Sequence, residues 1–576
     1  MTDTKTYGPK TRFANEIHKT KFQSPGEDFY ASIIRQAGAL SDNPEHFQRL
    51  KRIYREQRFL NGGRIQSAIG APRQTTPYNC FVSRTIGDSM VGIMAALSEA
   101  AETLRLGGGI GYNFGTLRPR GARIKSLDSQ SSGPLSFMTV FDALCKTISS
   151  AGHRRGAQMG VLPVDHPDIE EFITSKNNHT ELTQFNISVG VTDKFMQAVK
   201  EDGDFDLVWN GEVYKTIKAK YLWDLILRST WDWADPGVLF MDTINKKNNL
   251  WYCETIAATN PCGEQPLPPY GACLLGSFNL TKYLYRYEDE SAGRHRYGFA
   301  FEQFIEDIPD VVRALDNVVD RAIYPLPEQE QEAKSKRRMG IGITGLANVV
   351  EAMGHLYGSE GCKEITRQIM TVLRDEAYKA SIELAKEKGA FPLFSTDMLK
   401  SEFCKKLPEK IREDIGKYGI RNSHLLSIAP TGSISIAADN VSSGIEPVFS
   451  YYYDRPYQTF EGPRIERVED YAYRFLTVLG KTADQVPVFD HVDMLTLVSE
   501  YVDSACSKTC NVGDDVTWEQ FKEVYMRAYD GGASGCTTFR ISGKRFALLT
   551  AAPKEEEIVE GGACYINLET GQKECS

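Results

Sequence analysis

Two prolines flank a cysteine and a glutamate in the stretch Asn260-Pro261-Cys262-Gly263-Glu264-Gln265-Pro266-Leu267. Proline lacks a backbone donor and disfavours helix in the residue before it, so we expect an extended chain or a loop. Side chains of an extended chain alternate with a period of two, which predicts that Asn260, Cys262 and Glu264 face the same side. An amide, a thiol and a carboxylate would then converge, as in an active-site loop. The residues alone leave open whether Cys262 is catalytic.

The bulk composition excludes several classes of protein. The chain has 576 residues, of which 41% are hydrophobic and 25% charged, as in an ordinary globular protein. A net charge of −9 argues against a nucleic-acid partner. No apolar run reaches the roughly 18 residues of a membrane span, so no membrane association is expected. The polar N-terminus lacks a signal core, which predicts a cytoplasmic protein whose thiols stay reduced unless redox turnover uses them.

The composition and hydrophobic pattern of the sequence predict three regions. Residues 1–60 are polar with short helical patterns, and we expect a short helical N-terminal region. From 61 to 545, glycine-rich turns alternate with helical patterns and apolar runs, which is typical of an α/β domain. Residues 546–576 are charged and glycine-containing and are predicted to form a flexible tail.

Several elements have clear start or stop signals. The expected helices run over 90–104 with Asp88 or Ser89 as N-cap, from the N-cap Thr192 toward Gly203, and over 372–388. Residues 341–346 and 425–430 read as buried strands that end in turns.

The cysteines provide candidate redox groups. Besides Cys262, the candidates are Cys80, Cys273 and the tail pair Cys564 and Cys575. The local pattern around Cys80 equally suits a buried core cysteine. Cysteine is rare near exposed termini, so a tail with two thiols can carry reducing equivalents by thiol–disulfide exchange.

Three glycine-rich loops could contact a ligand. Residues 107–111 allow close backbone approach, although a tight turn explains them as well. Residues 150–160 include Arg154 and Arg155, which suit an anionic ligand or a solvated turn. Residues 429–435 follow an expected strand and could cradle a phosphate with backbone N–H groups and hydroxyls, or simply cap a helix. No zinc spacing or P-loop lysine motif occurs, so we expect an enzyme that uses thiols and a phosphorylated substrate without a protein-bound metal.

These motifs together resemble the catalytic subunit of ribonucleotide reductase over about residues 60–545. The motifs that carry the resemblance, in the family's order, are Phe59-Leu60 to Gly63-Arg64-Ile65-Gln66-Ser67, Asn79-Cys80-Phe81-Val82, 107–111, 154–157, 260–264, Gly276-Ser277-Phe278-Asn279-Leu280, Pro430-Thr431-Gly432-Ser433-Ile434-Ser435 and Gly444-Ile445-Glu446-Pro447. One such motif is weak evidence, but the ordered set is highly specific.

Within that family the chain is similar to the adenosylcobalamin-dependent class, class II. The short Cys262–Cys273 gap and the segment 534–540 resemble that class. The tyrosine pair with which class I enzymes relay a radical from a metal-bearing partner subunit is missing. The resemblance therefore implies adenosylcobalamin as cofactor. The alternative is a class I catalytic subunit that needs a separate metal-containing radical-generating subunit.

The resemblance implies a fold and a mechanism. The fold is a ten-stranded α/β barrel of two five-stranded parallel half-sheets, with a central finger loop carrying the thiyl cysteine. Cys262 would hold the thiyl radical, Glu264 would act as base and Asn260 would bind the ribose hydroxyls. Cys80 and Cys273 would deliver two electrons, and ribonucleotides, with diphosphates favoured, would become 2′-deoxyribonucleotides for DNA synthesis.

The resemblance also implies binding sites and partners. Substrate-binding positions would be Asn79, Gly108, Gly109, Pro430, Thr431, Gly432, Ser433, Ile434 and Ser435. A deoxynucleoside triphosphate or ATP specificity effector would contact Asp88, Ser89, Lys125, Arg154 and Arg155, in a homodimer. Cys564 and Cys575 would reduce the active-site disulfide and be restored by thioredoxin or glutaredoxin. With about 60 residues before the barrel, the family's ATP-cone is expected to be absent.

Two other kinds of protein compete with this interpretation. One is a nucleotide-binding regulatory protein with an inactive site, which the complete set of Asn260, Cys262, Glu264, Cys80 and Cys273 disfavours. The other is a plain thiol–disulfide oxidoreductase, which the absence of a Cys-x-x-Cys motif disfavours.

Overall fold

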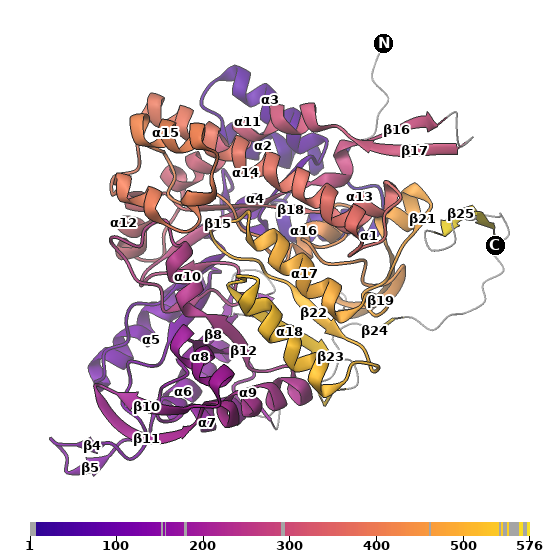
Figure 1. Ribbon diagram of the computed structural model, residues 1–576. Helices are drawn as coiled ribbons and strands as arrows, with labels where there is room; N and C mark the ends of the chain where they lie inside the picture. The colour runs from indigo at the N-terminus through magenta and orange to yellow at the C-terminus, as the bar shows by residue number, and fades with distance from the viewer. Residues whose placement is uncertain are drawn as a thin grey trace.

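Five parallel strands form one half of a central barrel; two of them, β8 (Gln158–Pro163) and β12 (Gly237–Phe240), are labelled in Figure 1. In spatial order they are β2 (Cys80–Val82), β3 (Gly109–Asn113), β8 (Gln158–Pro163), β9 (Phe185–Val191) and β12 (Gly237–Phe240). Most of their residues are buried, as expected for parallel strands covered by helices. The structure is a computed structural model that describes residues 7–150, 154–155, 157–177, 181–289, 294–459, 462–540, 543–544, 550–551, 564–567 and 573–575.

A second parallel half completes the barrel. Its regular strands are β15 (Ala272–Asn279), β18 (Met339–Thr344), β22 (Thr509–Val512) and β23 (Gly535–Arg540). The segment 425–428 lies between β18 and β22. Two isolated parallel bridges, Ile341–Leu426 and Ile428–Cys506, join it to the chain on either side. This segment is the strand expected at 425–430, although only bridges and single hydrogen bonds hold it.

Two antiparallel contacts close the ring. β15 pairs with β2, and β12 pairs with β23. Going round, the order is β2, β3, β8, β9, β12, β23, β22, the 425–428 segment, β18 and β15. The expected ten-stranded barrel of two five-stranded parallel halves is confirmed.

The helices follow their capping signals. α5 (Met90–Arg105) begins after Ser89, whose side chain accepts a hydrogen bond from the Gly92 N–H. α8 (Asp193–Glu201) begins in the same way after Thr192. α14 (Glu360–Lys388) ends before Gly389 as expected but begins at Glu360 rather than 372, because Ser359 caps it there. No helix in the described ranges is long and apolar enough to cross a membrane.

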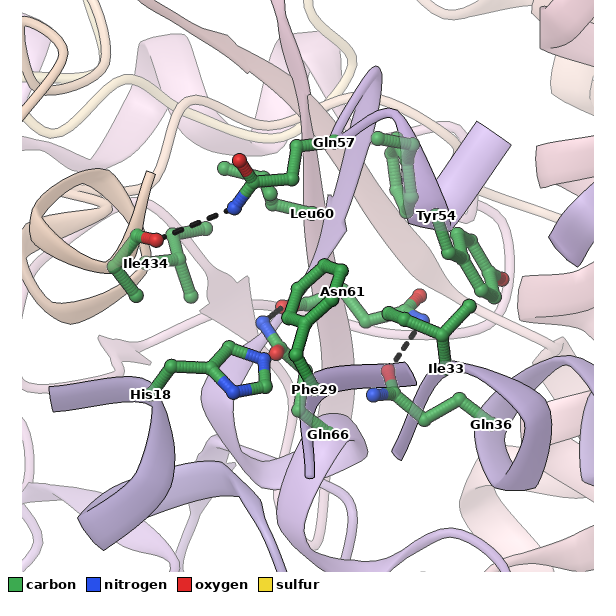
Figure 2. A pocket seen from close by; sticks show the side chains of 12 residues that line it. His18, Phe29, Ile33, Gln36, Tyr54, Gln57, Leu60, Asn61, Gln66 and Ile434 are labelled. Carbon is green, nitrogen blue, oxygen red and sulfur yellow. Dashed lines mark hydrogen bonds between the residues drawn. The ribbon is translucent and has the colours of Figure 1, made fainter. Parts of the chain in front are cut away.

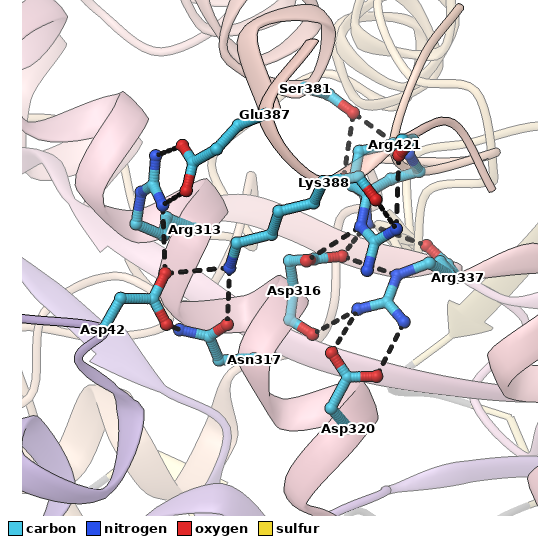
Figure 3. Close-up of polar contacts among 12 residues, drawn as sticks. Asp42, Arg313, Asp316, Asn317, Asp320, Arg337, Ser381, Glu387, Lys388 and Arg421 are labelled. Atoms are coloured by element: carbon cyan, nitrogen blue, oxygen red, sulfur yellow. Dashed lines mark hydrogen bonds and ion pairs between the residues drawn. The ribbon is translucent and has the colours of Figure 1, made fainter. Parts of the chain in front are cut away.

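Three helices precede the barrel: α1 (Arg12–Phe22), α2 (Phe29–Leu40) and α3 (Pro44–Arg55). Asp42, between α2 and α3, accepts hydrogen bonds from Arg313 of α11 (Phe301–Arg321) at 3.0 Å and from Lys388 of α14 at 2.8 Å. In the same region Arg337 binds Asp316 and Asp320 (Figure 3). The ion pairs of Asp42 fasten the N-terminal helices to α11 and α14. The expected boundary at residue 60 stays a prediction, since β1 (Phe59–Asn61) pairs directly with β15.

The chain that carries Cys262 is a short hairpin inside the ring. β13 (Ala258–Thr259) pairs antiparallel with β14 (Pro266–Leu267), and β13 contacts β2, β3 and β8. The tip is a tight turn in which the Gly263 N–H donates to the Asn260 carbonyl at 3.1 Å, with φ of 79° at Gly263. Of the two expectations, an extended chain or a loop, the structure shows the loop, because Gly263 permits the left-handed conformation that the turn requires.

Candidate active site

The hairpin, here called the finger (residues 258–267), lies flush against both halves of the barrel. A Cβ added at Gly111 of β3 would lie 1.8 Å from the Thr259 carbonyl oxygen, and one added at Gly109 would lie 3.1 Å from Pro261 Cγ. A Cβ added at Gly340 of β18 would lie 2.5 Å from Gln265 Nε2. At Gly111 the obstacle is backbone, so only glycine allows that approach. Within the 107–111 motif, Gly109 and Gly111 thus have a structural role in seating the finger.

Backbone and side-chain hydrogen bonds hold the finger tip. Asn186 of β9 donates from Nδ2 to the Pro261 carbonyl at 2.7 Å. On the other side, the Ala505 N–H donates to the Glu264 carbonyl at 3.0 Å. Asn186 was not singled out from the sequence, although a polar residue between the apolar Phe185 and Ile187 was a usable signal.

Three of the expected catalytic side chains meet at the base of the finger. The Asn260 amide Nδ2 lies 3.1 Å from Cys80 Sγ, and the Cys80 thiol donates toward Glu264 Oε1 at 3.7 Å. Asn260 Oδ1 accepts from the Gln265 N–H at 2.9 Å, which fixes the orientation of the amide. All three residues are buried. They converge although the chain between them turns.

Cys80 and Cys273 lie directly opposite each other. They are paired positions of the antiparallel strands β2 and β15, and both thiols are reduced. Paired Cα atoms in such a ladder are about 4.5–5.5 Å apart, within the range of about 4.4–6.8 Å that a disulfide spans. This pair can therefore be oxidised to a disulfide without moving the barrel. The sequence separation of the two cysteines gave no direct sign of it.

Burial controls the chemistry of this pair. Burial, and then the neighbouring Glu264 carboxylate, raises the pKa of the Cys80 thiol well above its ordinary value. Burial also raises the pKa of the Cys273 thiol, which has no exposed surface. Both groups are thus protonated thiols at neutral pH. In contrast, Cys262 at the tip is exposed.

The loop expected to hold phosphate opens α16 (Gly432–Ala437) after Thr431, which has φ of 53°. The Thr431 and Ser435 hydroxyls lie 2.8 Å apart and both contact the Thr344 hydroxyl at 3.0 Å, in a buried network. Ile434 is also buried. The exposed part of the loop is Pro430 and Gly432, beside the partly exposed Ser433, whose Oγ accepts from Lys21 of α1 at 3.3 Å.

The remaining substrate and effector predictions are spread over several elements. Asn79 accepts through its carbonyl from the Gly109 N–H at 2.9 Å, and Gly108 packs against Phe81. Asp88 binds Arg118 at 2.8 Å, and Ser89 caps α5. Lys125 is exposed on the hairpin of β4 (Arg123–Ile124) and β5 (Ser129–Gln130). The side chains of Arg154 and Arg155, and residues 151–153 and 156 of their loop, lie outside the described residues, so effector binding stays a prediction.

The backbone of the tail brings its two cysteines together. Cys564 and Cys575 are paired positions of the antiparallel strands β25 (Cys564–Asn567) and β26 (Lys573–Cys575). Their eleven-residue separation is thus compatible with one dithiol. Their side chains, and most of the predicted flexible tail, lie outside the described residues.

A separate cavity lies between the N-terminal helices, β1 and α16 (Figure 2). The polar side chains of Gln36, Tyr54 and Asn61 line it. Its volume of about 20 Å³ suits a single water rather than a nucleotide. Among the described residues, no group of three or more His, Cys, Asp or Glu side chains could hold a metal ion.

Comparison with known proteins places this geometry in context. Residues 78–486 and 479–539 match the family described as ribonucleotide reductase, barrel domain. The chain is 35% identical over 519 residues to a vitamin B12-dependent ribonucleoside-diphosphate reductase from Thermoplasma acidophilum, covering 84% of this chain and 64% of the relative. A protein with the same name from Mycobacterium tuberculosis is 36% identical, covering 82% of this chain and 69% of the relative. A vitamin B12-dependent ribonucleotide reductase from Streptomyces avermitilis is 28% identical, covering 85% of this chain and 59% of the relative. The chain thus spans about two thirds of the length of these relatives.

Proposed function

Because the chain belongs to the ribonucleotide reductase family, we propose that it reduces ribonucleotides to 2′-deoxyribonucleotides by a thiyl-radical mechanism that depends on adenosylcobalamin. The observation that carries the proposal is the arrangement of thiols around the finger. Cys262 is exposed at the tip, and Asn260, Glu264 and the opposed pair Cys80 and Cys273 are buried beneath it. A plain regulatory protein has no use for this arrangement.

The exposed position of Cys262 fits an external source of the radical. The cobalamin cofactor, when bound, supplies a carbon-centred radical through cleavage of its cobalt–carbon bond. Cys262, the exposed thiol of the cluster, would face it and give up its hydrogen atom. The resulting thiyl radical would remove the 3′-hydrogen of the ribose.

The buried residues then have defined tasks. Glu264, held between the finger and the barrel wall, would take the proton of the 3′-hydroxyl, and Asn260 would bind the ribose hydroxyls. Loss of the protonated 2′-hydroxyl as water needs two electrons and two hydrogens. Oxidation of the Cys80 and Cys273 thiols to a disulfide supplies both. The Cys262 thiol would then return its hydrogen atom to C3′, which regenerates the thiyl radical, so the reaction balances.

The proposal extends to binding partners. The exposed start of α16 at Gly432 and Ser433, with Lys21 beside it, would receive the substrate phosphates. We assign diphosphates because the Thermoplasma and Mycobacterium relatives are named ribonucleoside-diphosphate reductases. The tail dithiol would reduce the Cys80–Cys273 disulfide, with thioredoxin or glutaredoxin as the external reductant. A specificity effector near Asp88 and Lys125 and a homodimer complete the proposal.

One assay separates this function from its main alternative. The purified chain is incubated with a ribonucleoside diphosphate, a dithiol reductant and adenosylcobalamin, with the triphosphate in a parallel reaction. We expect deoxyribonucleotide only when the cofactor is present and without any second protein. Product that requires a separate metal-containing subunit instead of adenosylcobalamin would identify a class I catalytic subunit.

A further inference from the structure

A fully buried arginine occupies the same row of the barrel as the two opposed thiols. Cys80 is paired with Cys273 across β2 and β15. On the other side of β15, Leu274 is level with Met339 of β18, so Cys273 is level with Arg338, one residue before β18 begins. Residues at the same level of neighbouring strands project to the same face of a sheet.

That face is the barrel interior. Leu275 and Gly340 form the next pair of the same β15–β18 ladder, two residues along from Cys273 and Arg338. A Cβ at Gly340 would meet Gln265 of the finger, so this row of side chains points inward. Arg338 therefore lies in the layer beneath the finger, beside Cys273, and only 2% of its side chain is exposed.

The Arg338 guanidinium is held by two carboxylates, one at each of its terminal nitrogens. Its Nη1 lies 2.7 Å from Glu332 Oε1, and its Nη2 contacts Glu254. Lys336 also contacts both carboxylates, at 3.0 Å and 2.9 Å. The Nε–H of Arg338 is buried and has no hydrogen-bond acceptor within the described part of the chain. A buried charged group with a spare donor is costly unless it serves a second partner.

The charged groups around Cys273 come from several elements. Burial raises the pKa of the Cys273 thiol, the Arg338 guanidinium lowers it, and the carboxylates of Asp503, Glu264 and Glu332 raise it further. Among these groups Arg338 is the cation. It is thus the group that favours a negative charge on the Cys273 sulfur.

We propose that Arg338 is a positioning residue for the redox pair, stabilising Cys273 as the thiolate that leaves when the Cys80–Cys273 disulfide is reduced. An attacking dithiol forms a new S–S bond with Cys80, the Cys80–Cys273 bond breaks, and Cys273 departs with the electron pair. A second thiol of the reductant then displaces Cys80, and protons return to both sulfurs. The inference rests on the proposed function in that turnover would form this disulfide repeatedly.

The test uses the full chain without nucleotide or cobalamin, so its result is independent of the proposed activity. In a Cys564→Ser/Cys575→Ser background, the Cys80–Cys273 disulfide is formed with diamide, and its reduction by dithiothreitol is followed by mass spectrometry from about pH 7 to 9. The charge is removed in Arg338→Gln/Glu254→Gln, which leaves Lys336 and Glu332 paired. Arg338→Lys keeps the charge. The matched control is Arg337→Gln/Asp320→Asn, which removes a neighbouring ion pair.

We expect the charge-free variant to be reduced about tenfold more slowly, Arg338→Lys to stay within about threefold of the parent, and the control to stay within about twofold. Glu332→Gln removes a carboxylate that opposes Arg338 and should speed reduction by about twofold to threefold, which keeps the proposal testable if the double variant does not fold. An unchanged rate of reduction in the charge-free variant, or equal slowing in that variant and in Arg338→Lys, would overturn the proposal. So would slower reduction in the control or in Glu332→Gln.

Discussion

Two pairs of cysteines in this protein occupy paired positions of antiparallel strands, one pair in the barrel and one in the tail. Cys80 faces Cys273 across the antiparallel contact that closes the barrel, and Cys564 faces Cys575 across a short hairpin of the tail. The register sets both pairs at disulfide distance. The barrel pair is buried beneath the finger, where its thiols are protonated and shielded from solvent. If the barrel pair reduces a bound substrate as proposed, its burial would keep an external reductant away from it, and the tail pair would be needed to reduce it.

The strongest test of the comparison removes the barrel pair. Cys80→Ser and Cys273→Ser should each lower the rate of deoxynucleotide formation by about 10³-fold or more, because neither serine can supply the electrons. The assay is product formation with excess dithiothreitol. Cys145→Ser, at a buried cysteine of α6 (Pro134–Thr147), is the control and should retain activity. A barrel variant with near-normal turnover would refute the role of the pair.

Thiol reactivity should separate the barrel pair from the exposed thiol. Because the pKa of Cys80 and that of Cys273 are raised, the thiolate fraction of each is small at pH 8 and grows only as pH rises further. We expect iodoacetamide to modify both about 100-fold more slowly than the exposed Cys262. Peptide mapping of a time course measures the rates. Comparable rates at all three cysteines would show that the finger does not shield the pair.

The tail pair should matter for repeated turnover and not for the first. Cys564→Ser/Cys575→Ser should leave single-turnover product unchanged and lower multiple turnover with thioredoxin by about tenfold or more, because the external protein cannot reach the buried disulfide. Dithiothreitol, which is small, should restore much of the rate. An equal loss with both reductants would argue that the tail has a different role.

The seat of the finger should be sensitive to a single methyl group. Gly111→Ala would place Cβ 1.8 Å from the Thr259 carbonyl oxygen, so the finger must move. We expect a loss of about 1–3 kcal/mol in the free energy of unfolding, measured with denaturant. Gly38→Ala in α2, where the nearest atom is 3.9 Å away, is the control and should gain about 0.5–1 kcal/mol. Similar effects at both sites would mean that the finger is loosely held.

Local signals in the sequence predicted much of this architecture. Ser89 and Thr192 started their helices as expected because capping is a local hydrogen bond. The ordered motifs identified the barrel, and through the resemblance they named Cys80 and Cys273 as partners. What the sequence could not supply was pairing between distant segments, such as the 425–428 segment with its neighbours or β15 with β18.

Local reasoning failed where one residue controlled the backbone. The period of two in 260–264 was interrupted at Gly263, whose positive φ turns the chain. The hydroxyls of Thr431 and Ser435 looked available for phosphate, yet they bond to each other and to Thr344, which is far away in sequence. In both cases the outcome depended on tertiary contacts that no local pattern encodes.

The most direct test of the account is a single turnover without any reductant. The pre-reduced chain is mixed with adenosylcobalamin and a ribonucleoside diphosphate, quenched in acid and mapped by mass spectrometry. We predict one Cys80–Cys273 disulfide for each deoxyribonucleotide formed in a Cys564→Ser/Cys575→Ser background. Deoxyribonucleotide formed while Cys80 and Cys273 both remain thiols would contradict the account.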